Sequence, residues 1–321
     1  MYRFLLVTLL AAAAASTAHA QAVDPITVSV VPDTPRPYQT VTVTPGSTFF
    51  DPASALISIS VNGSVIESGG GVQSVPITVA GPGEETVITI KAVVGADTYT
   101  KQITLRPADV ALVVDAVSTV HPFYLGAPLV APQGRARVVA IPDLRTSAAA
   151  RINPAELVYT WRWGDQVLTD QSGIGRSVLT VTAPVRYRDA DLSVTVTDQA
   201  RTLVAEASTV ISPVDPFARV YHTDPLMGPD FDHALSGQFV LKGEEDAFRG
   251  VAYFFGTTPS LSWAVNSQTL SSDQDVTVRT TGSGEGTATL SFSAQDSSGD
   301  QSASMHLPVK FGSKKPNIFG F

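Results

Sequence analysis

The residues of this sequence that could do acid–base or nucleophilic chemistry occur without a catalytic motif around them. There is no cysteine, which excludes a cysteine nucleophile, a thiolate zinc site, a disulfide and an iron–sulfur cluster. No Gly-x-Ser-x-Gly elbow is present. A serine–histidine–acid triad would need one histidine to reach both a serine and a carboxylate. Beyond residue 20 the histidines are His121, His222, His233 and His306. We therefore predict that the chain is not an enzyme, with a hydrolase as the less favoured alternative.

Acidic residues gather in two short stretches that could hold calcium, which binds six to eight oxygen ligands. The second stretch lacks the alternating carboxylates of a calcium loop, and aspartate is common in tight turns for conformational reasons. We predict no cofactor and no metal, and keep these aspartates as candidate ligands of a structural calcium. They are Asp224, Asp230, Asp232, Asp296 and Asp300.

Two further stretches have the composition of a functional site without its context. Residues 244–246 are Glu-Glu-Asp, but glycoside hydrolysis needs two carboxyl groups about 5–10 Å apart across a cleft. We predict an exposed turn there. Residues 282–286 are Gly-Ser-Gly-Glu-Gly, with no lysine after them and no strand-to-helix transition around them, which excludes a phosphate-binding loop. We predict a hairpin turn for this stretch.

Aromatic residues form the most conspicuous pattern in the middle of the chain. Tyr159, Trp161 and Trp163 alternate with polar residues, so on a strand they share one face. We predict that this stripe packs in a core, and the alternative is an exposed platform on which sugars stack. Aromatic residues also gather in 251–255 and in the predicted loop 221–231. Those residues would form an enlarged core that covers a long loop, or else a binding face.

The elements that must position these residues come after an export signal. Residues 1–3 are positively charged, 4–15 are mostly apolar, and small residues at 18 and 20 fit a cleavage site after residue 20. Twelve residues span only about 18 Å as a helix, short of the roughly 30 Å of a bilayer core. We predict a Sec-type signal peptide over 1–20 and a location outside the cytoplasm: extracellular, on the cell surface or periplasmic. The net charge of −8 without a basic cluster argues against nucleic acid as a partner.

One pattern occurs three times at a spacing of 102 residues. Residues 56–63, 158–165 and 260–267 each alternate along a strand and end in a pair of turn-forming residues. Ile59, Trp161 and Trp263 occupy the same register within these segments, which marks them, with Trp163, as predicted core residues. Internal repeats of this kind indicate tandem domains.

Short β-branched runs with period two follow each repeat in the same order, interrupted by glycine, proline and asparagine. About 100 residues per repeat is the size of an immunoglobulin-like β-sandwich. The predicted fold is all-β, with three tandem immunoglobulin-like antiparallel sandwiches after the signal peptide. The predicted bounds are 21–107, 108–213 and 214–311, followed by a tail over 312–321.

A resemblance to a known family is carried by the middle repeat. Residues 159–165, Tyr-Thr-Trp-Arg-Trp-Gly-Asp, resemble the tryptophan-x-aromatic-glycine-aspartate signature of PKD-type bacterial immunoglobulin-like domains, and residues 191–198 are similar to their late strand. The resemblance implies that Trp161 is a core tryptophan and that Gly164 and Asp165 turn a hairpin. The whole chain also resembles multi-sandwich secreted proteins of candidate-phylum bacteria.

These resemblances imply domains that space, present or attach other molecules outside bacterial cells, mostly without catalysis. We therefore expect a non-catalytic extracellular stalk, scaffold or adhesion protein whose partners are envelope or extracellular proteins or glycans, with no transmembrane helix after the signal. The alternative is a carbohydrate- or protein-binding module with a defined site in the third sandwich.

The tail is the last candidate for an interaction. Ile318, Phe319 and Phe321 follow several polar and turn-forming residues, and burying one such apolar side chain is worth about 1.5–3 kcal/mol. The tail would be a mobile end, as terminal segments often are, or these three residues would dock on a partner.

Overall fold

The computed structural model describes residues 24–71, 73–282 and 284–312. The predicted signal peptide and the candidate docking residues Ile318, Phe319 and Phe321 lie outside them. The described residues form strands and three 3₁₀ turns, which confirms the all-β prediction. The chain divides into two compact units, the first made of 1–33, 40–77 and 86–105 and the second of 34–39, 78–85 and 106–321.

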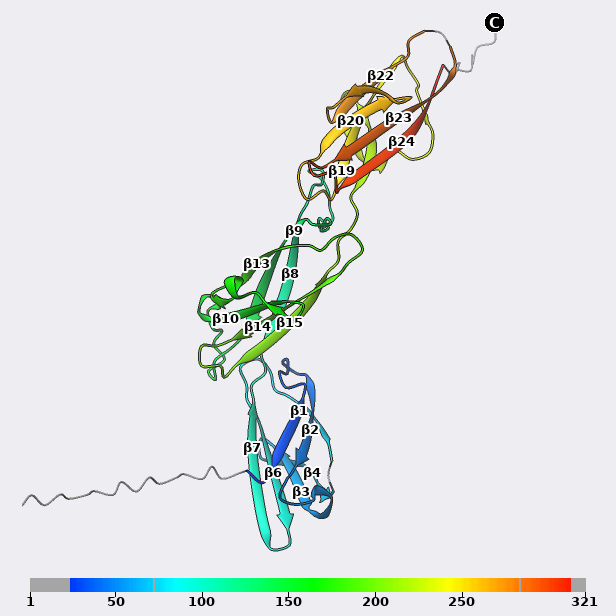
Figure 1. Ribbon diagram of the computed structural model, residues 1–321. Coiled ribbons are helices and arrows are strands. Elements are labelled where there is room, and N and C mark those ends of the chain that lie inside the picture. The colour runs from blue at the N-terminus through cyan, green and yellow to red at the C-terminus, as the bar shows by residue number, and fades with distance from the viewer. Residues whose placement is uncertain (1–23, 72, 283, 313–321) are drawn as a thin grey trace, which may run out of the picture. The chain divides into compact units, whose positions relative to one another are not determined.

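The first unit contains one sandwich (Figure 1). Its core comes from alternating β-branched residues such as Ile57 and Ile59 on one strand and Ile88 and Ile90 on its neighbour, all almost fully buried. One sheet has the order β1-β2-β5 and the other β4-β3-β6-β7. The strands are β1 (Thr27–Val31), β2 (Thr40–Gly46), β3 (Leu56–Val61), β4 (Ser64–Gly70), β5 (Val75–Thr78), β6 (Thr86–Val94) and β7 (Asp97–Leu105).

The second unit contains two sandwiches, and the first of these uses residues 109–211. Its sheets have the orders β13-β9-β8 and β11-β10-β14-β15, with β12 also paired to β10. The strands are β8 (Asp109–Val117), β9 (Arg135–Asp143), β10 (Val158–Trp163), β11 (Gln166–Val167), β12 (Gly173–Ile174), β13 (Val178–Thr182), β14 (Ala190–Thr197) and β15 (Val204–Ile211).

The third sandwich adds a hairpin and a short parallel strand to the same plan. Its sheets have the orders β17-β16-β19-β22 and β18-β24-β23-β20-β21, and β18 pairs parallel to β24. The strands are β16 (Phe217–Asp224), β17 (Gly228–Ala234), β18 (Phe239–Val240), β19 (Glu245–Tyr253), β20 (Ser260–Val265), β21 (Gln268–Ser271), β22 (Asp275–Arg279), β23 (Gly286–Gln295) and β24 (Ser302–Phe311).

The strand connections are the same in all three sandwiches. In each, the first two main strands share a sheet with the strand that follows the central hairpin, and the hairpin and the last two strands form the other sheet. This division of antiparallel strands between two sheets is immunoglobulin-like. The predicted fold class is therefore confirmed.

The hairpin turns are made by the residue types that tolerate positive φ. Asn62 and Gly63 have φ values of 49° and 85°, and Asn266 and Ser267 have 48° and 71°. In both turns the asparagine Oδ1 accepts a 2.9 Å hydrogen bond from the backbone of the adjacent strand, from Val87 in one case and Thr289 in the other. The asparagine therefore both adopts the turn conformation and links the turn to the adjacent strand.

A second local motif recurs just before the central hairpin. The 3₁₀ helix η2 (Pro154–Glu156) is capped by Asn153 through a hydrogen bond from the Ala155 N–H to the Asn153 side chain. Asp51 caps η1 (Pro52–Ser54) through the Ala53 N–H in the same way. The two capping residues are again 102 positions apart, so the repeat extends further toward the N-terminus than the sequence analysis found.

Three local predictions were wrong. The stretch 282–286 was predicted as a hairpin turn, but β22 ends at Arg279, β23 begins at Gly286, and these two strands lie in different sheets and do not pair. Residues 245 and 246 are not an exposed turn: they lie in β19, because Glu245 faces Arg279 across the strand pair and Asp246 contacts His222. Residues 221–231 belong largely to the hairpin β16–β17 and are not a long loop.

Gly250 is required for close packing of the third sandwich. It lies in β19, and a Cβ at this position would overlap the ring of Phe292, which is itself fully buried. We expect Gly250→Ala to destabilise the protein by about 1–3 kcal/mol, the cost of overpacking a core. Gly70→Ala is the matched control, since a Cβ there meets no atom within 4 Å. Denaturant unfolding of both variants measures the difference, and equal stabilities would contradict this packing.

Within the described residues, no helix is long and apolar enough to cross a membrane.

Candidate functional site

The four histidines that the structure describes do not form a triad. His306 Nδ1 lies 2.9 Å from Ser291 Oγ, and His222 Nε2 lies 3.2 Å from Asp246 Oδ1. In the described part of the chain, no histidine hydrogen-bonds to both a serine hydroxyl and a carboxylate. The serine–histidine pair and this histidine–acid pair therefore use different histidines on different strands, and they do not share a site.

The calcium candidates lie at two places in the third sandwich: Asp224, Asp230 and Asp232 belong to the β16–β17 hairpin, and Asp296 and Asp300 to the turn between β23 and β24. Three of them, Asp224, Asp230 and Asp296, act as local hydrogen-bond acceptors. Asp224 accepts the backbone N–H groups of residues 226 and 227, and Asp230 contacts His233 Nδ1. Asp296 accepts from the Gln301 N–H, and the backbone N–H of Asp300 donates to Ser298. No group of three or more histidine or acidic side chains that could hold a metal occurs among residues 24–71, 73–282 and 284–312. Asp232 belongs to the same hairpin as Asp230.

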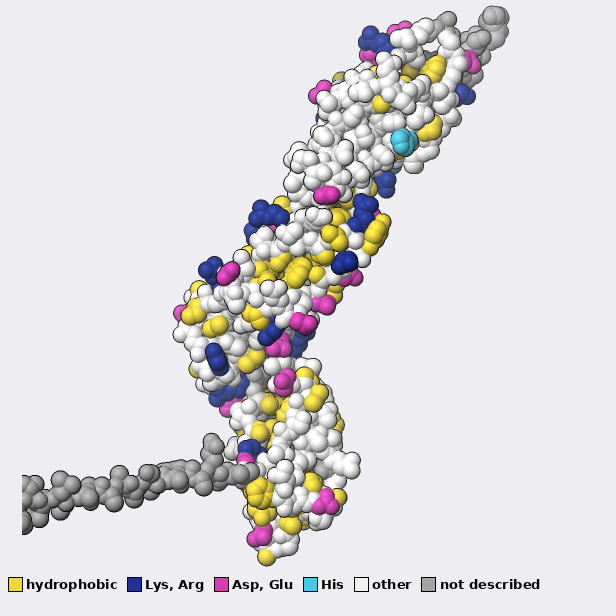
Figure 2. Space-filling model, viewed as in Figure 1, with side chains coloured by type: hydrophobic (Ala, Val, Ile, Leu, Met, Phe, Trp, Pro, Cys, Tyr) yellow, Lys and Arg dark blue, Asp and Glu magenta, His cyan; other side chains and the backbone are white. Residues whose placement is uncertain are grey.

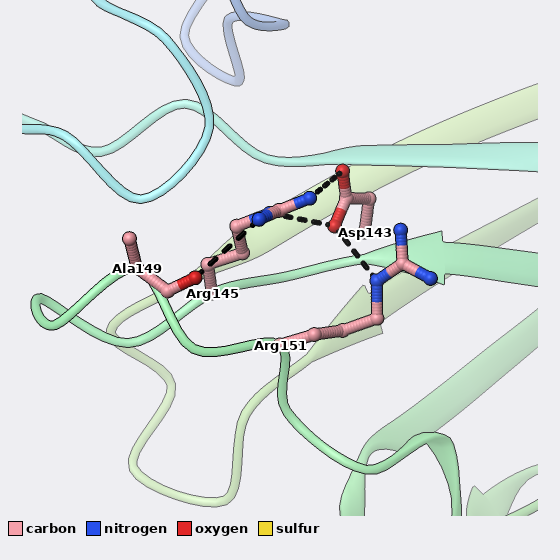
Figure 3. Close-up of polar contacts among 4 residues, drawn as sticks. All are labelled: Asp143, Arg145, Ala149 and Arg151. Atoms are coloured by element: carbon pink, nitrogen blue, oxygen red, sulfur yellow. Dashed lines mark hydrogen bonds and ion pairs between the residues drawn. The ribbon is translucent and has the colours of Figure 1, made fainter.

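The best-formed charged cluster was not found from the sequence. Asp143 at the end of β9 accepts hydrogen bonds from Arg145 Nε at 3.0 Å and from Arg151 Nε at 3.1 Å (Figure 3). Burial raises the pKa of the Asp143 carboxyl, but the two guanidinium groups outweigh it and hold the pKa below its usual value. Since Arg145 also donates to the carbonyl of Ala149, the cluster fixes the connection from β9 to η2.

The aromatic stripe of β10 is buried and cannot serve as a sugar platform. Tyr159 and Trp161 have no exposed surface, and Trp163 packs partly buried against the same core. Trp161 Nε1 donates to the Arg176 carbonyl at 2.8 Å, and Trp263 Nε1 donates to that of Asp273 at 3.1 Å. Ile59 and Trp263 are also fully buried. Ile59, Trp161 and Trp263 therefore lie at equivalent places in three cores, and Trp163 packs partly buried at the edge of the second core.

The aromatic residues of the third sandwich meet a loop from the second. Residues 118–134 connect β8 to β9, and His121 and Tyr124 of this loop pack on Tyr221, Phe231 and Tyr253 of β16, β17 and β19. We call these five residues the aromatic joint. These aromatic residues pack in a core, as the first of the two interpretations expected, but the loop that this core covers is 118–134 of the preceding sandwich and not 221–231.

His121 is the centre of the aromatic joint. Its ring stacks on Phe231 with 4.4 Å between centroids and meets the Tyr253 ring edge-on at 5.7 Å. Only 8% of the residue is exposed. The Phe123 N–H donates to His121 Nδ1 at 3.1 Å, which requires that nitrogen to be unprotonated. The site thus holds histidine in its neutral form.

Backbone hydrogen bonds close the aromatic joint on one side. The Thr119 N–H donates to the Phe255 carbonyl at 2.9 Å, and the Phe254 N–H donates back to Thr119 at 2.7 Å. The Thr119 hydroxyl donates to Ala252 and accepts from the Phe255 N–H. Gln301 adds a 2.8 Å bond from its amide nitrogen to the Pro132 carbonyl. These hydrogen bonds pair the backbone that directly follows β19 with the loop of the second sandwich.

The tyrosine hydroxyl groups inside the aromatic joint form a hydrogen bond with each other. The hydroxyl groups of Tyr221 and Tyr253 are 2.6 Å apart and hydrogen-bonded. Burial, reinforced by this bond, raises the pKa of Tyr253 far above its ordinary value. The joint is therefore a packed core with a neutral hydrogen-bonded pair, rather than an acid–base site.

The state of His121 makes stability depend on pH. Burial lowers the pKa of His121 below its ordinary value of 6.5. The unfolded chain therefore binds more protons just below pH 6.5, and the free energy of unfolding falls as the pH drops from 6.5. We expect this decline in denaturant titrations between pH 7.5 and 5. His121→Phe keeps a stacked ring without a titrating group and should show a smaller decline; identical slopes would contradict the burial of a neutral imidazole.

A second feature of the third sandwich is an open pocket in its core. It has a volume of about 240 Å³ and lies between the two sheets, next to the connection from β22 to β23. Its apolar lining includes Leu241, Val265, Val278, Leu290, Val309 and Phe311. Leu241, Leu290 and Val309 are also members of the buried core. The pocket is thus an unfilled extension of the core and carries no catalytic group.

Charged side chains do not gather by sign on the face shown in Figure 2. Lys and Arg are interspersed with Asp and Glu on the visible face, and neither kind forms a patch there (Figure 2). A continuous basic strip of the kind that binds a phosphate backbone is absent from that face.

No protein-family model and no curated protein matches the chain. Among solved structures, it is similar to the three N-terminal domains of the outer capsid protein Hoc of bacteriophage RB49, at 11% identity and a TM-score of 0.26 over 91% of this chain and 100% of that one. It is also similar to Sidekick-1 immunoglobulin domains 1–4, at 14% identity and a TM-score of 0.25 over 87% and 73%. The fibronectin(III)-like modules of Clostridium thermocellum CbhA match at 12% identity and a TM-score of 0.23 over 66% and 100%.

Proposed function

We propose that this chain is a non-catalytic extracellular or cell-surface scaffold protein of a bacterium, which holds or presents envelope or extracellular proteins or glycans. The observation that supports the proposal best is the aromatic joint. Five aromatic rings and a set of backbone hydrogen bonds hold the second and third sandwiches in one compact unit. Because the rings of the joint pack on one another and its tyrosine hydroxyl groups hydrogen-bond to each other, the joint favours a mechanical role over a chemical one.

Location is tested by fractionating native cells and treating intact cells with protease. The proposal expects the chain to be degraded from outside while a cytoplasmic marker survives. If the first residues act as the export signal, the purified protein begins at residue 21, which mass spectrometry measures. A full-length chain retained in the cytoplasm would overturn the proposed location.

The absence of catalysis is tested with the purified protein on ester, glycoside and peptide substrates. His306→Gln is the informative variant, because His306 and Ser291 form the serine–histidine pair of the described structure. The proposal expects no turnover by either protein. Turnover that is lost in His306→Gln would show that the exposed pair is a nucleophilic site.

A further inference from the structure

We propose that Ile318, Phe319 and Phe321, from the segment that follows β24, insert into the open core pocket of the third sandwich of the same chain. This inference goes beyond the proposed function and does not depend on it. The pocket is lined by side chains of both sheets and is continuous with the buried core. An engineered apolar cavity of about 150 Å³ accepts benzene, so a pocket of about 240 Å³ accommodates an aromatic ring.

The chain leaves the described structure at the rim of this pocket. Phe311, the last residue of β24, lines the pocket, and Gly312 follows with a φ of 73°. A Cβ on Gly312 would overlap the Gly284 carbonyl and the Glu285 backbone. Only glycine fits this left-handed, closely packed position. The backbone therefore turns at Gly312 against residues that themselves border the pocket.

The composition of the segment suits a return to the pocket. Residues 313–317 are polar or turn-forming, and the apolar residues begin at Ile318. Five residues reach at most about 17 Å when extended, and the lining starts at Phe311 itself. A tether this short gives an effective concentration in the millimolar range, which favours the segment's own pocket over that of a second copy.

Charge at the rim complements the segment. Lys314 and Lys315 precede the apolar residues. Glu285 adjoins Gly284 of the lining, and the backbone carbonyl of Glu244 accepts a hydrogen bond from Thr280, also of the lining. Within the described residues, neither glutamate forms a salt bridge, whereas Glu245 nearby is paired with Arg279. If the segment returns to the pocket, its two lysines would bring positive charge toward Glu285 and toward Glu244, which also acts electrostatically on Arg279.

The absence of cysteine allows a direct test by cross-linking the full chain. One cysteine replaces Thr281, an exposed residue of the pocket lining, and another replaces Phe321. We expect an intramolecular disulfide to form under mild oxidation, seen as a faster-migrating monomer on a non-reducing gel. Disulfide-linked dimers in place of the monomer would show that a second copy supplies the segment and would overturn the proposal.

A second variant separates docking from chance collisions of a tethered end. Ile318→Ser combined with Phe319→Ser is added to the cysteine pair. We expect cross-linking to slow by about tenfold or more, because burying one large apolar side chain is worth at least a factor of ten in an equilibrium constant. Both changes lie beyond β24, outside the strands of the sandwich. An unchanged rate would mean that the segment does not enter the pocket.

Discussion

Replacing Trp161 with alanine is expected to lower the free energy of unfolding by about 3–5 kcal/mol, the usual cost of removing a large aromatic side chain from a core. The indole is fully buried between the sheets of the second sandwich. The substitution also removes the Nε1–H that satisfies the Arg176 carbonyl. Guanidinium denaturation of the full chain measures the loss.

Trp163→Ala is the matched control for this prediction. Trp163 lies two residues further along the same face of β10, but it is only partly buried. Since its removal opens a smaller cavity, the expected loss is clearly smaller than for Trp161. Equal losses for the two variants would contradict the position of Trp161 at the centre of the core.

His121→Ala is expected to uncouple the second and third sandwiches and to cost about 2–5 kcal/mol, the range for deleting a large buried side chain. The ring belongs to a loop of the second sandwich, yet its ring contacts beyond its own loop are to the third. Calorimetry of the full chain should therefore show that the transition of these two sandwiches separates into two steps.

Phe123→Ala keeps the same loop and is the control for the uncoupling. Phe123 is 73% exposed and its ring meets Phe231 of the joint only at 6.1 Å, so truncating its side chain removes an outer contact and leaves His121 in place. We expect it to unfold like the unaltered protein. If Phe123→Ala separated the transitions as strongly as His121→Ala, loop conformation rather than ring packing would hold the sandwiches together.

The parts of the fold that the sequence predicted depend on neighbours along the chain. Alternation places Trp161 and Trp263 inside because adjacent residues of a strand face opposite sides. The turns at Asn62 and Asn266 follow from their tolerance of positive φ, which is a property of the residues themselves. Such features require no knowledge of distant partners.

The parts that the sequence missed depend on contacts between distant segments. Thr119 bonds to Phe254, 135 positions away, and nothing in the composition of the loop indicates that pairing. Glu245 was taken for part of a turn because its partner Arg279 lies on another strand. Residues 280–285 are rich in glycine, and that composition suits a hairpin and a crossing between sheets equally well.

The candidate docking residues and the export signal stay predictions, since they lie outside the described residues. The calcium hypothesis also stays a prediction, and a calcium titration of unfolding temperature measures it directly. The structure shows that the carboxylates of Asp224 and Asp296 accept hydrogen bonds from backbone N–H groups of nearby residues. These hydrogen bonds already occupy part of the acceptor capacity of each carboxylate.

The aromatic joint also defines which piece of this chain can be exchanged as a module. Residues 212–216 connect the second sandwich to the third, so a domain boundary chosen by chain connectivity alone would fall there. A crossover there would give the third sandwich a new neighbour and leave Tyr253 and Phe231 without His121 and Tyr124. The two sandwiches from 106 onward should therefore be exchanged or truncated together, because separating them at their junction would expose an aromatic surface that promotes aggregation.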